Sequence, residues 1–148
     1  MIQALTNKLL DFTPKNSDES LPQAAVLILC YEKDNDLYFV MTERSNSLPS
    51  HPGEVAFPGG KREKKDKNLK QTALREATEE ISLDPAKVEL LGQLDPLESR
   101  FGLSVTPFVG ILKEKFELEP NPDEVADIFY LPLSFFKNDP LIKRGVTN

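Results

Sequence analysis

Three glutamates lie within five residues of one another in the segment from Thr72 to Ser82, at positions 76, 79 and 80. In an α-helix, which turns about 100° per residue, their carboxylates project into one arc of about 100°. Like charges at this spacing repel by a few tenths of a kcal/mol, and a divalent cation between them reverses that cost. Carboxylate oxygens suit Mg²⁺ or Mn²⁺, with water and phosphate oxygens completing the coordination. The spacing therefore makes Glu76, Glu79 and Glu80 candidate metal ligands.

A solvated acidic face explains the same residues without any ligand. Arg75 and Glu79 are four residues apart, which is the spacing of an ordinary surface ion pair. Acidic clusters on exposed helix faces are common, so the helix alone favours this second interpretation. The segments before the helix are therefore needed to distinguish a metal site from a solvated acidic face.

A helix from Asn68 to Ile81 is predicted to carry these side chains. Asn68 is a favourable N-cap residue, and the proline-containing segment 83–87 ends the helix. Leu74, Ala77 and Ile81 fall between about 100° and 160° from the first glutamate and form an apolar stripe. We therefore expect one edge of the helix to pack on a sheet and the adjacent edge to present the carboxylates.

Two adjacent glycines precede that helix in the run Pro58-Gly59-Gly60. Glycines permit backbone angles that are closed to other residues, and they let a ligand approach the main chain closely. We therefore expect a sharp break in the chain here, and we take Gly59 and Gly60 as candidate substrate-binding residues.

The rest of the chain is predicted to alternate helices and strands. A hairpin with Asp and Asn in its turn is indicated by two apolar runs, at 24–32 and 37–44. A short amphipathic helix is expected at about 2–11, and further strands are expected at 54–57, 88–94, 105–112 and 128–130. This order favours a mixed α/β or α+β sandwich.

Length and composition set limits on function. A chain of 148 residues suits one domain, and a net charge of −6 disfavours general binding of nucleic acids. Cys30 is the single cysteine and sits in an apolar run, where a buried thiol is the expected outcome. That run is too short to span a membrane, and the N-terminus does not look like a signal peptide. We expect a cytoplasmic protein without membrane partners.

The segment from Gly60 to Leu83 resembles the signature of the Nudix hydrolases. That signature has a glycine, five residues, a glutamate, seven residues, and then Arg-Glu-apolar-x-Glu-Glu-x-Gly-apolar. Gly60 and the run Arg75–Ile81 match it. This chain departs in three places: Asp66 replaces the first glutamate, the following spacer is one residue longer, and Ser82 replaces the glycine.

The resemblance extends upstream to the coenzyme A pyrophosphatase branch of that family. The matching positions are Thr42, Arg44, Ser45, Gly53 and Phe57 to Gly60, with His51 where this branch often has histidine. Pro49 stands where the branch carries a second arginine, and the segment 121–136 is similar to the downstream part of the branch. The chain ends earlier than expected for the branch, which predicts that a final strand and helix are absent or that the sequence is truncated.

The resemblance implies a single Nudix domain over residues 1–148, folded as an α/β/α sandwich with a mixed sheet. It implies metal-dependent hydrolysis of a pyrophosphate bond, in which the cations polarise phosphoryl oxygens and acidify bound water. Coenzyme A or its thioesters would give 4′-phosphopantetheine and adenosine 3′,5′-bisphosphate. Two alternatives stay open: a Nudix enzyme for ADP-ribose, dinucleotides or nucleoside triphosphates, and a catalytically silent nucleotide-binding module.

The site residues follow from the helix and the resemblance together. We expect Glu76 and Glu80 to be the main ligands of Mg²⁺ or Mn²⁺, Glu79 to share the site, and Arg75 to orient one carboxylate. The general base is Glu76 or Glu79, or Glu124 reaching in from a downstream loop. For Glu124, a carboxylate at a helix N-terminus is an equal alternative.

Substrate contacts are predicted for a further group of residues. Arg44 and Ser45 are expected to meet phosphates, although Arg44 also fits a surface cation at a strand end. His51 binds substrate or, as we favour, pins its loop by a hydrogen bond. Asp66 is expected to be a solvated loop carboxylate rather than an outer metal ligand. Phe101 is expected in the core or a lid rather than stacked on a base. The expected partner is a nucleotide or coenzyme A substrate, and a homodimer is left open.

Overall fold

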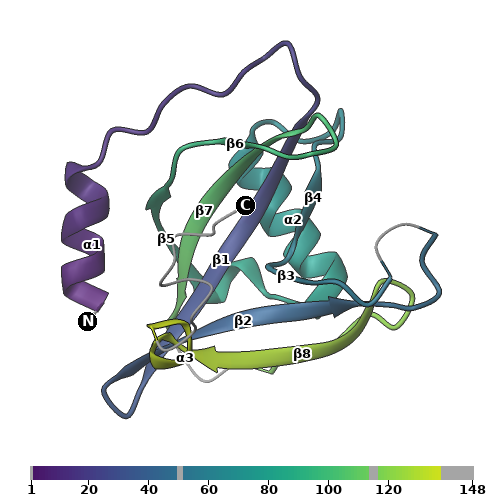
Figure 1. The fold of residues 1–148 in the computed structure, drawn as a ribbon. Helices are drawn as coiled ribbons and strands as arrows, with labels where there is room; N and C mark the ends of the chain where they lie inside the picture. The colour runs from purple at the N-terminus through teal and green to yellow at the C-terminus, as the bar shows by residue number, and fades with distance from the viewer. Residues whose placement is uncertain (1, 50–51, 114–116, 138–148) are drawn as a thin grey trace.

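A mixed β-sheet forms the centre of the computed structural model, which describes residues 2–49, 52–113 and 117–137 (Figure 1). The helical elements are α1 (Ile2–Asp11), α2 (Leu69–Ile81), the 3₁₀ turn η1 (Pro85–Lys87) and α3 (Leu133–Lys137). The strands are β1 (Gln23–Lys33), β2 (Asp36–Arg44), β3 (Val55–Ala56), β4 (Gly59–Lys61), β5 (Val88–Gln93), β6 (Leu97–Glu98), β7 (Ser104–Leu112) and β8 (Val125–Pro132). The main path of the sheet runs β3-β2-β1-β7-β5.

Strand β1 organises the sheet because it pairs with three other strands. It forms an antiparallel hairpin with β2, a parallel pair with β7 and a short antiparallel pair with β4. The hairpin turn places Asp34 and Asn35 at φ of 52° and 62°, the positive angles that such tight turns need and that these residue types tolerate. The predicted Asp and Asn turn is therefore confirmed.

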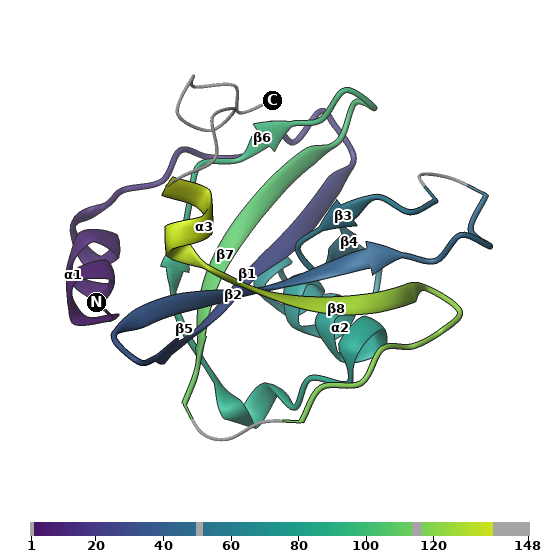
Figure 2. The same ribbon diagram turned by 60° about the horizontal axis from the view of Figure 1, so that its bottom comes forward.

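Helices cover both faces of the sheet (Figure 2). On one face, Leu27 and Leu29 of β1 pack in a buried cluster with Ala73, Ala77 and Ile81 of α2. On the other face, residues of α1 and α3 pack around a smaller buried cluster whose members are Cys30, Leu37 and Ile111. The expected layered α/β fold with a mixed sheet is therefore confirmed.

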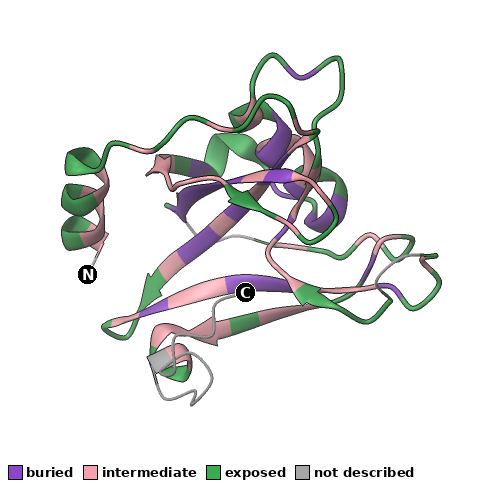
Figure 3. Ribbon diagram, turned by 45° about the horizontal axis from the view of Figure 1, so that its top comes forward, coloured by how far each residue is buried: buried purple, intermediate pink, exposed green. Residues whose placement is uncertain are grey.

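The two layers of helices are not equally buried (Figure 3). Helix α2 buries five of its residues, whereas none of α1 is buried. Cys30 lies in β1 with no exposed surface, and burial raises the pKa of its thiol to about 12, which fits the expected inert core residue. None of the helices in the described ranges is long and apolar enough to cross a membrane.

The structure corrects the expected break at the adjacent glycines. Gly59 and Gly60 lie in β4, paired with Val26 and Ala25 of β1, and neither has a positive φ. A Gly-Gly-Lys segment has little intrinsic strand propensity, so this strand arises from its partner rather than from its own sequence. Strand β6 and helix α3 were not predicted for a similar reason, since both are short and depend on tertiary contacts.

Candidate active site

Helix α2 begins and ends where local chemistry predicts. Asn68 has an extended backbone, and its side chain accepts a hydrogen bond of 2.8 Å from the N–H of Gln71. At the other end Ser82 adopts the left-handed conformation with φ of 59°, and its N–H donates to the carbonyl of Thr78. Ser82 therefore occupies the terminal position where glycine is the favoured residue.

The predicted apolar stripe of α2 packs on the sheet, but the buried face of the helix is wider than expected. Its buried residues are Thr72, Ala73, Ala77, Glu80 and Ile81, whereas Leu74 is only half-buried. Glu80 thus lies within the buried face, with 8% of its surface exposed. Its Oε1 accepts a hydrogen bond of 3.1 Å from the N–H of Gly59. The sheet strand β4 sits against α2, and its main chain supplies this donor to the carboxylate.

Glu76 rests directly on the second glycine of β4. A Cβ atom added to Gly60 would lie 2.5 Å from Cδ of Glu76. A side chain at position 60 would collide with the carboxylate of Glu76 where it now lies. The glycines therefore permit the close approach that we expected, but the group that approaches is a carboxylate of the same chain. The N–H of Gly59 is likewise used by Glu80.

Glu124 joins these two carboxylates from the segment 117–124. It lies in a turn before β8 and not in a helix, so the alternative of a helix N-terminal carboxylate is wrong. Backbone hydrogen bonds of 2.9 Å fix the segment: the N–H of Asn121 donates to the carbonyl of Glu80, and the N–H of Ser45 donates to the carbonyl of Glu124. The Oε2 atom of Glu124 is buried and has no hydrogen-bond partner among the residues that the structure describes.

The electrostatics of Glu76 and Glu80 follow from this arrangement. Burial raises the pKa of Glu80 to about 8; the negative charges of Glu76 and Glu124 add to the rise, and the Gly59 N–H and the positive charge of Arg44 oppose it. Burial is also the main cause of the raised pKa of Glu76. We call Glu76, Glu80 and Glu124 the glutamate cluster; its negative charge is only partly compensated by the protein.

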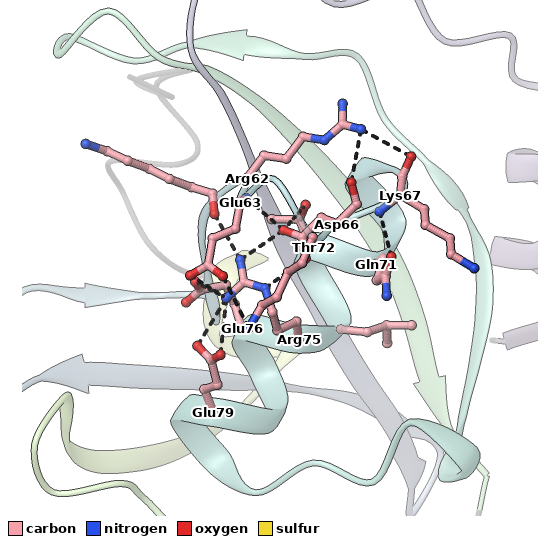
Figure 4. Close-up of polar contacts among 12 residues, drawn as sticks. Arg62, Glu63, Asp66, Lys67, Gln71, Thr72, Arg75, Glu76 and Glu79 are labelled. Atoms are coloured by element: carbon pink, nitrogen blue, oxygen red, sulfur yellow. Dashed lines mark hydrogen bonds and ion pairs between the residues drawn. The ribbon is translucent and has the colours of Figure 1, made fainter.

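Arg75 of α2 pairs with a second set of carboxylates, those of Asp66, Glu76 and Glu79 (Figure 4). The guanidinium donates to Oδ1 of Asp66 from Nε at 2.9 Å and to Oδ2 from Nη2 at 3.0 Å. Its Nη1 donates to Glu76 at 2.9 Å and to both oxygens of Glu79 at 3.2 and 3.3 Å. The expected charge-assisted hydrogen bond from Arg75 is present, and it reaches more carboxylates than the one foreseen.

The expectation that Asp66 is a solvated loop carboxylate is wrong. Asp66 is 3% exposed, and it also accepts hydrogen bonds from the N–H of Glu63 at 2.9 Å and from the hydroxyl of Thr72 at 3.0 Å. The hydrogen bonds from Arg75 hold the pKa of Asp66 well below its usual range in spite of burial. Asp66 therefore orients Arg75. The nine-residue spacing between Asp66 and Arg75 does not predict their ion pair, because the conformation of the loop from Glu63 to Asp66 determines whether the two side chains meet.

Two of the residues expected to contact substrate lie at the end of β2. Arg44 is half-buried, and its charge acts on Glu80, so it is not a simple surface cation. Ser45 is buried, and its hydroxyl lies 2.8 Å from the hydroxyl of Ser47. A phosphate contact from Ser45 would compete with this contact inside the loop. His51 lies outside the described residues.

Phe101 does not lie in the core. It lies in the turn between β6 and β7, with 59% of its surface exposed. The guanidinium carbon of Arg100 lies 5.1 Å from the centre of its ring, a cation–π contact. The expected core position of Phe101 is therefore wrong, and a lid position stays a prediction.

A divalent cation fits the glutamate cluster by its donor set. The buried Oε2 of Glu124, which has no hydrogen-bond partner among the described residues, and the raised pKa of Glu80 both indicate negative charge that the protein compensates only in part. As they stand, no three acidic, histidine or cysteine side chains in the described ranges lie close enough together to hold a metal ion. An open arrangement suits Mg²⁺, which keeps several waters and shares phosphate oxygens with its substrate.

A separate apolar hollow of about 710 Å³ lies on the opposite face of the sheet. It is bounded by α1 and α3, with Phe39, Phe57 and Val109 of the described chain among its lining residues. It has no carboxylate in its lining, so it does not extend the glutamate cluster.

Comparisons with known proteins agree with this geometry. A protein-family model described as NUDIX domain matches residues 21–146. The chain is 49% identical to the uncharacterized Nudix hydrolase NudL of Photorhabdus laumondii, over 82% of this chain and 64% of that protein. It is 41% identical to the mouse peroxisomal coenzyme A diphosphatase NUDT7, over 85% of this chain and 53% of that protein. The chain thus spans less than two thirds of the length of these relatives.

A solved structure supports the fold. The Nudix hydrolase RenU from M. smegmatis superimposes with a TM-score of 0.66, covering 85% of each chain. The two sequences are 18% identical, so this likeness concerns the fold alone.

Proposed function

This chain belongs to the Nudix hydrolase family, and from that membership we propose that it hydrolyses a pyrophosphate bond in a nucleoside diphosphate derivative. The observation that carries the proposal is the glutamate cluster. Glu76 and Glu80 of α2 meet Glu124 of the segment before β8, beside the glycines of β4. The negative charges of Glu76 and Glu124 add to the raised pKa of Glu80, and such a gathering of carboxylates is costly unless a cation completes it.

Glu76, Glu80 and Glu124 would hold Mg²⁺ or Mn²⁺ in this proposal. The bound ion would supply neutralisation of phosphate charge and a more acidic water. Glu80 is fixed by the N–H of Gly59, and Glu76 is fixed by Arg75. Arg44 is placed to contact a substrate phosphate, because its charge already acts on Glu80.

Glu124 is the best-placed candidate for the general base. Both oxygens of Glu79 are occupied by Nη1 of Arg75, and one oxygen of Glu76 receives the same group. Glu124 has a carboxylate oxygen, Oε2, that accepts no hydrogen bond from the described residues. We expect Glu124→Gln to lower kcat at least tenfold with little change in KM. An unchanged kcat would move the role to Glu76 or Glu79.

Coenzyme A or a thioester of it is our proposed substrate. The branch motif around Arg44 and Phe57 to Gly60 supports it, as does the similarity to a coenzyme A diphosphatase over most of this chain. Pro49, which replaces an arginine of the branch motif, keeps ADP-ribose, dinucleotides and nucleoside triphosphates as alternatives. The single domain, the cytoplasmic location and a homodimer stay predictions.

A substrate panel tests the proposal. The purified protein would be incubated with coenzyme A, ADP-ribose, a diadenosine polyphosphate and ATP, each with Mg²⁺ and with Mn²⁺, and the products identified by mass. We expect 4′-phosphopantetheine and adenosine 3′,5′-bisphosphate from coenzyme A. Turnover of ADP-ribose without cleavage of coenzyme A would overturn the substrate. The absence of metal-dependent hydrolysis on every member would favour a silent binding module.

A further inference from the structure

A second hollow, of about 580 Å³, lies at the N-terminal end of α2, away from the glutamate cluster. It is enclosed by the segment 15–19, the loop 62–67, the first turn of α2 and the sheet strands β5 and β7. The residues that matter in its lining are Lys15, Arg62, Lys67, Lys70, Thr106 and Phe108. Lys70 precedes Glu76 by six residues, which is about 9 Å along the helix axis.

The charge of this hollow is opposite to that of the chain. Four of its lining residues are cationic and one, Glu19, is acidic, whereas the chain carries a net charge of −6. Asp66 belongs to the same loop as Arg62 and Lys67, but its carboxylate is engaged by Arg75. Such a local excess of positive charge in an acidic protein attracts anions.

The backbone around the hollow adds to this charge. The first N–H groups of a helix have no partner within it and carry partial positive charge. Arg62 is held in place on this rim, because its Nη2 donates to the carbonyls of Asp66 at 3.2 Å and Lys67 at 3.1 Å (Figure 4). The guanidinium is therefore a fixed cation and not a freely moving side chain.

A buried hydroxyl at the floor of the hollow provides an independent observation. Thr106 of β7 is 2% exposed, and its Oγ1 has no hydrogen-bond partner among the described residues. Thr106 pairs with Ala25 in the parallel β1–β7 ladder, which places it on the face of the sheet that α2 covers. Buried polar groups are normally satisfied, and Thr106 is among the residues that line the hollow, so its hydroxyl is a candidate donor to a molecule bound there.

We propose that this hollow binds a small phosphate-bearing anion. Phosphate offers several acceptor oxygens, which can take hydrogen bonds from lysine, arginine and a threonine hydroxyl together. The volume exceeds that of one phosphate group, so the phosphate can belong to a larger molecule. It comes either from a free phosphorylated metabolite or from a phosphate of the substrate outside the cleaved linkage.

Titration with inorganic phosphate tests the site without any turnover. Binding would be followed by NMR chemical shifts of the full chain in chloride buffer, with EDTA present. We expect saturable binding in the wild type and at least tenfold weaker binding in Lys67→Ala/Lys70→Ala. The matched control is Lys64→Ala/Lys65→Ala, which removes two lysines of the same loop that do not line the hollow; it should bind phosphate as the wild type does.

Thr106→Val tests whether the anion binds inside the hollow, with a hydrogen bond from the threonine hydroxyl, or is only attracted to the surface lysines. Valine has the shape of threonine without the hydroxyl, so the variant should melt no lower than the wild type in phosphate-free buffer while binding phosphate several-fold more weakly. Unchanged binding in Thr106→Val would overturn the proposal, as would equal losses in both lysine pairs or no saturation at millimolar phosphate.

The source of the phosphate can then be distinguished, and this step alone rests on the proposed function. If the substrate supplies it, Lys67→Ala/Lys70→Ala should raise KM for coenzyme A but not for 3′-dephospho-coenzyme A. If a free anion supplies it, both KM values should stay equal to those of the wild type. Because the titration needs no hydrolysis, its failure differs from a failure of the proposed function.

Discussion

The loop carboxylate Asp66 and Glu80 of the glutamate cluster are both buried, yet their electrostatics are opposite. Asp66 receives two hydrogen bonds from Arg75, and its pKa lies below its usual range. Glu80 receives one hydrogen bond from a neutral N–H and faces other carboxylates, and its pKa is raised to about 8. The degree of burial is similar, at 3% and 8% exposed.

The difference shows that a charged partner decides whether burial prevails. The hydrogen bonds from Arg75 outweigh burial for Asp66, whereas burial is the largest effect on Glu80, whose carboxylate accepts a hydrogen bond from a neutral N–H. The group around Asp66 therefore contains its own cation, and our proposal is that a cation from outside completes the glutamate cluster.

The largest expected effect is the loss of activity in Glu80→Gln. The amide can still accept from the N–H of Gly59, but it is a weak ligand for a divalent cation, so we expect kcat to fall about 10³-fold. The metal-free variant should melt higher than the wild type at neutral pH, because folding no longer requires this side chain to take up a proton. Steady-state kinetics with Mn²⁺ and a thermal melt in EDTA measure the two effects.

Glu119→Gln is the matched control for that substitution. Its side chain is exposed, and its main-chain N–H and carbonyl groups form the hydrogen bonds to Ile81 and Ser82. It should keep the activity and the melting temperature of the wild type. Full activity in Glu80→Gln would remove this residue from the site.

The next largest effect is expected for Asp66→Asn. Asparagine removes the negative charge that Nε and Nη2 of Arg75 face, although Glu76 and Glu79 still pair with Nη1, so the free energy of unfolding should fall by about 2 kcal/mol. Urea unfolding measures the loss, and the double variant with Arg75→Met should recover part of it. Additive losses in the double variant would show that the two side chains do not act as a pair.

The pH dependence of stability should differ between the two acidic groups. Between the unfolded pKa of Glu80, near 4.5, and its folded pKa of about 8, only the folded state holds the proton. The metal-free protein should therefore lose stability as pH rises through this window, by on the order of 1 kcal/mol per pH unit. Asp66 has a lowered pKa, so its contribution is present above its unfolded value of 3.8 and is lost as the pH falls below that value.

Unfolding midpoints from pH 5 to pH 8, in EDTA and in Mn²⁺, check this expectation. The stabilisation by Mn²⁺ should grow with pH, since the ion binds the ionised form. Glu80→Gln should flatten the slope in EDTA, and an unchanged slope would assign it to another group.

The smallest effect is expected for Ser82→Gly at the end of α2. Glycine removes the penalty of a side chain at φ of 59°, so the free energy of unfolding should rise by about 0.5 kcal/mol. Urea midpoints would show it, and activity should stay unchanged because neither acidic group contacts Ser82. A lower midpoint would mean that the hydrogen bond of 3.3 Å from its hydroxyl to the carbonyl of Glu119 matters more.

Local sequence signals predicted much of the fold. The cap at Asn68, the extent of α2 and the Asp34-Asn35 turn follow from residue preferences and were foreseen. Strand β4 was missed, because the pairing partner and not the Gly-Gly sequence creates it.

The candidate site was predictable only in part. The glutamates of α2 and their link to Arg75 follow from helical spacing. The burial of Glu80 does not, because it depends on the N–H of Gly59 in β4, which donates to its carboxylate. The partner of Asp66 also depends on how a loop folds back, which no periodicity encodes.

The segment that delivers Glu124 is fastened to its neighbours through main-chain atoms. The N–H of Asn121 donates to the carbonyl of Glu80, and the N–H of Glu119 donates to the carbonyl of Ile81. These hydrogen bonds do not depend on the side chains of the residues that form them. Many amino-acid exchanges in this segment can therefore accumulate during evolution while the acid stays in position.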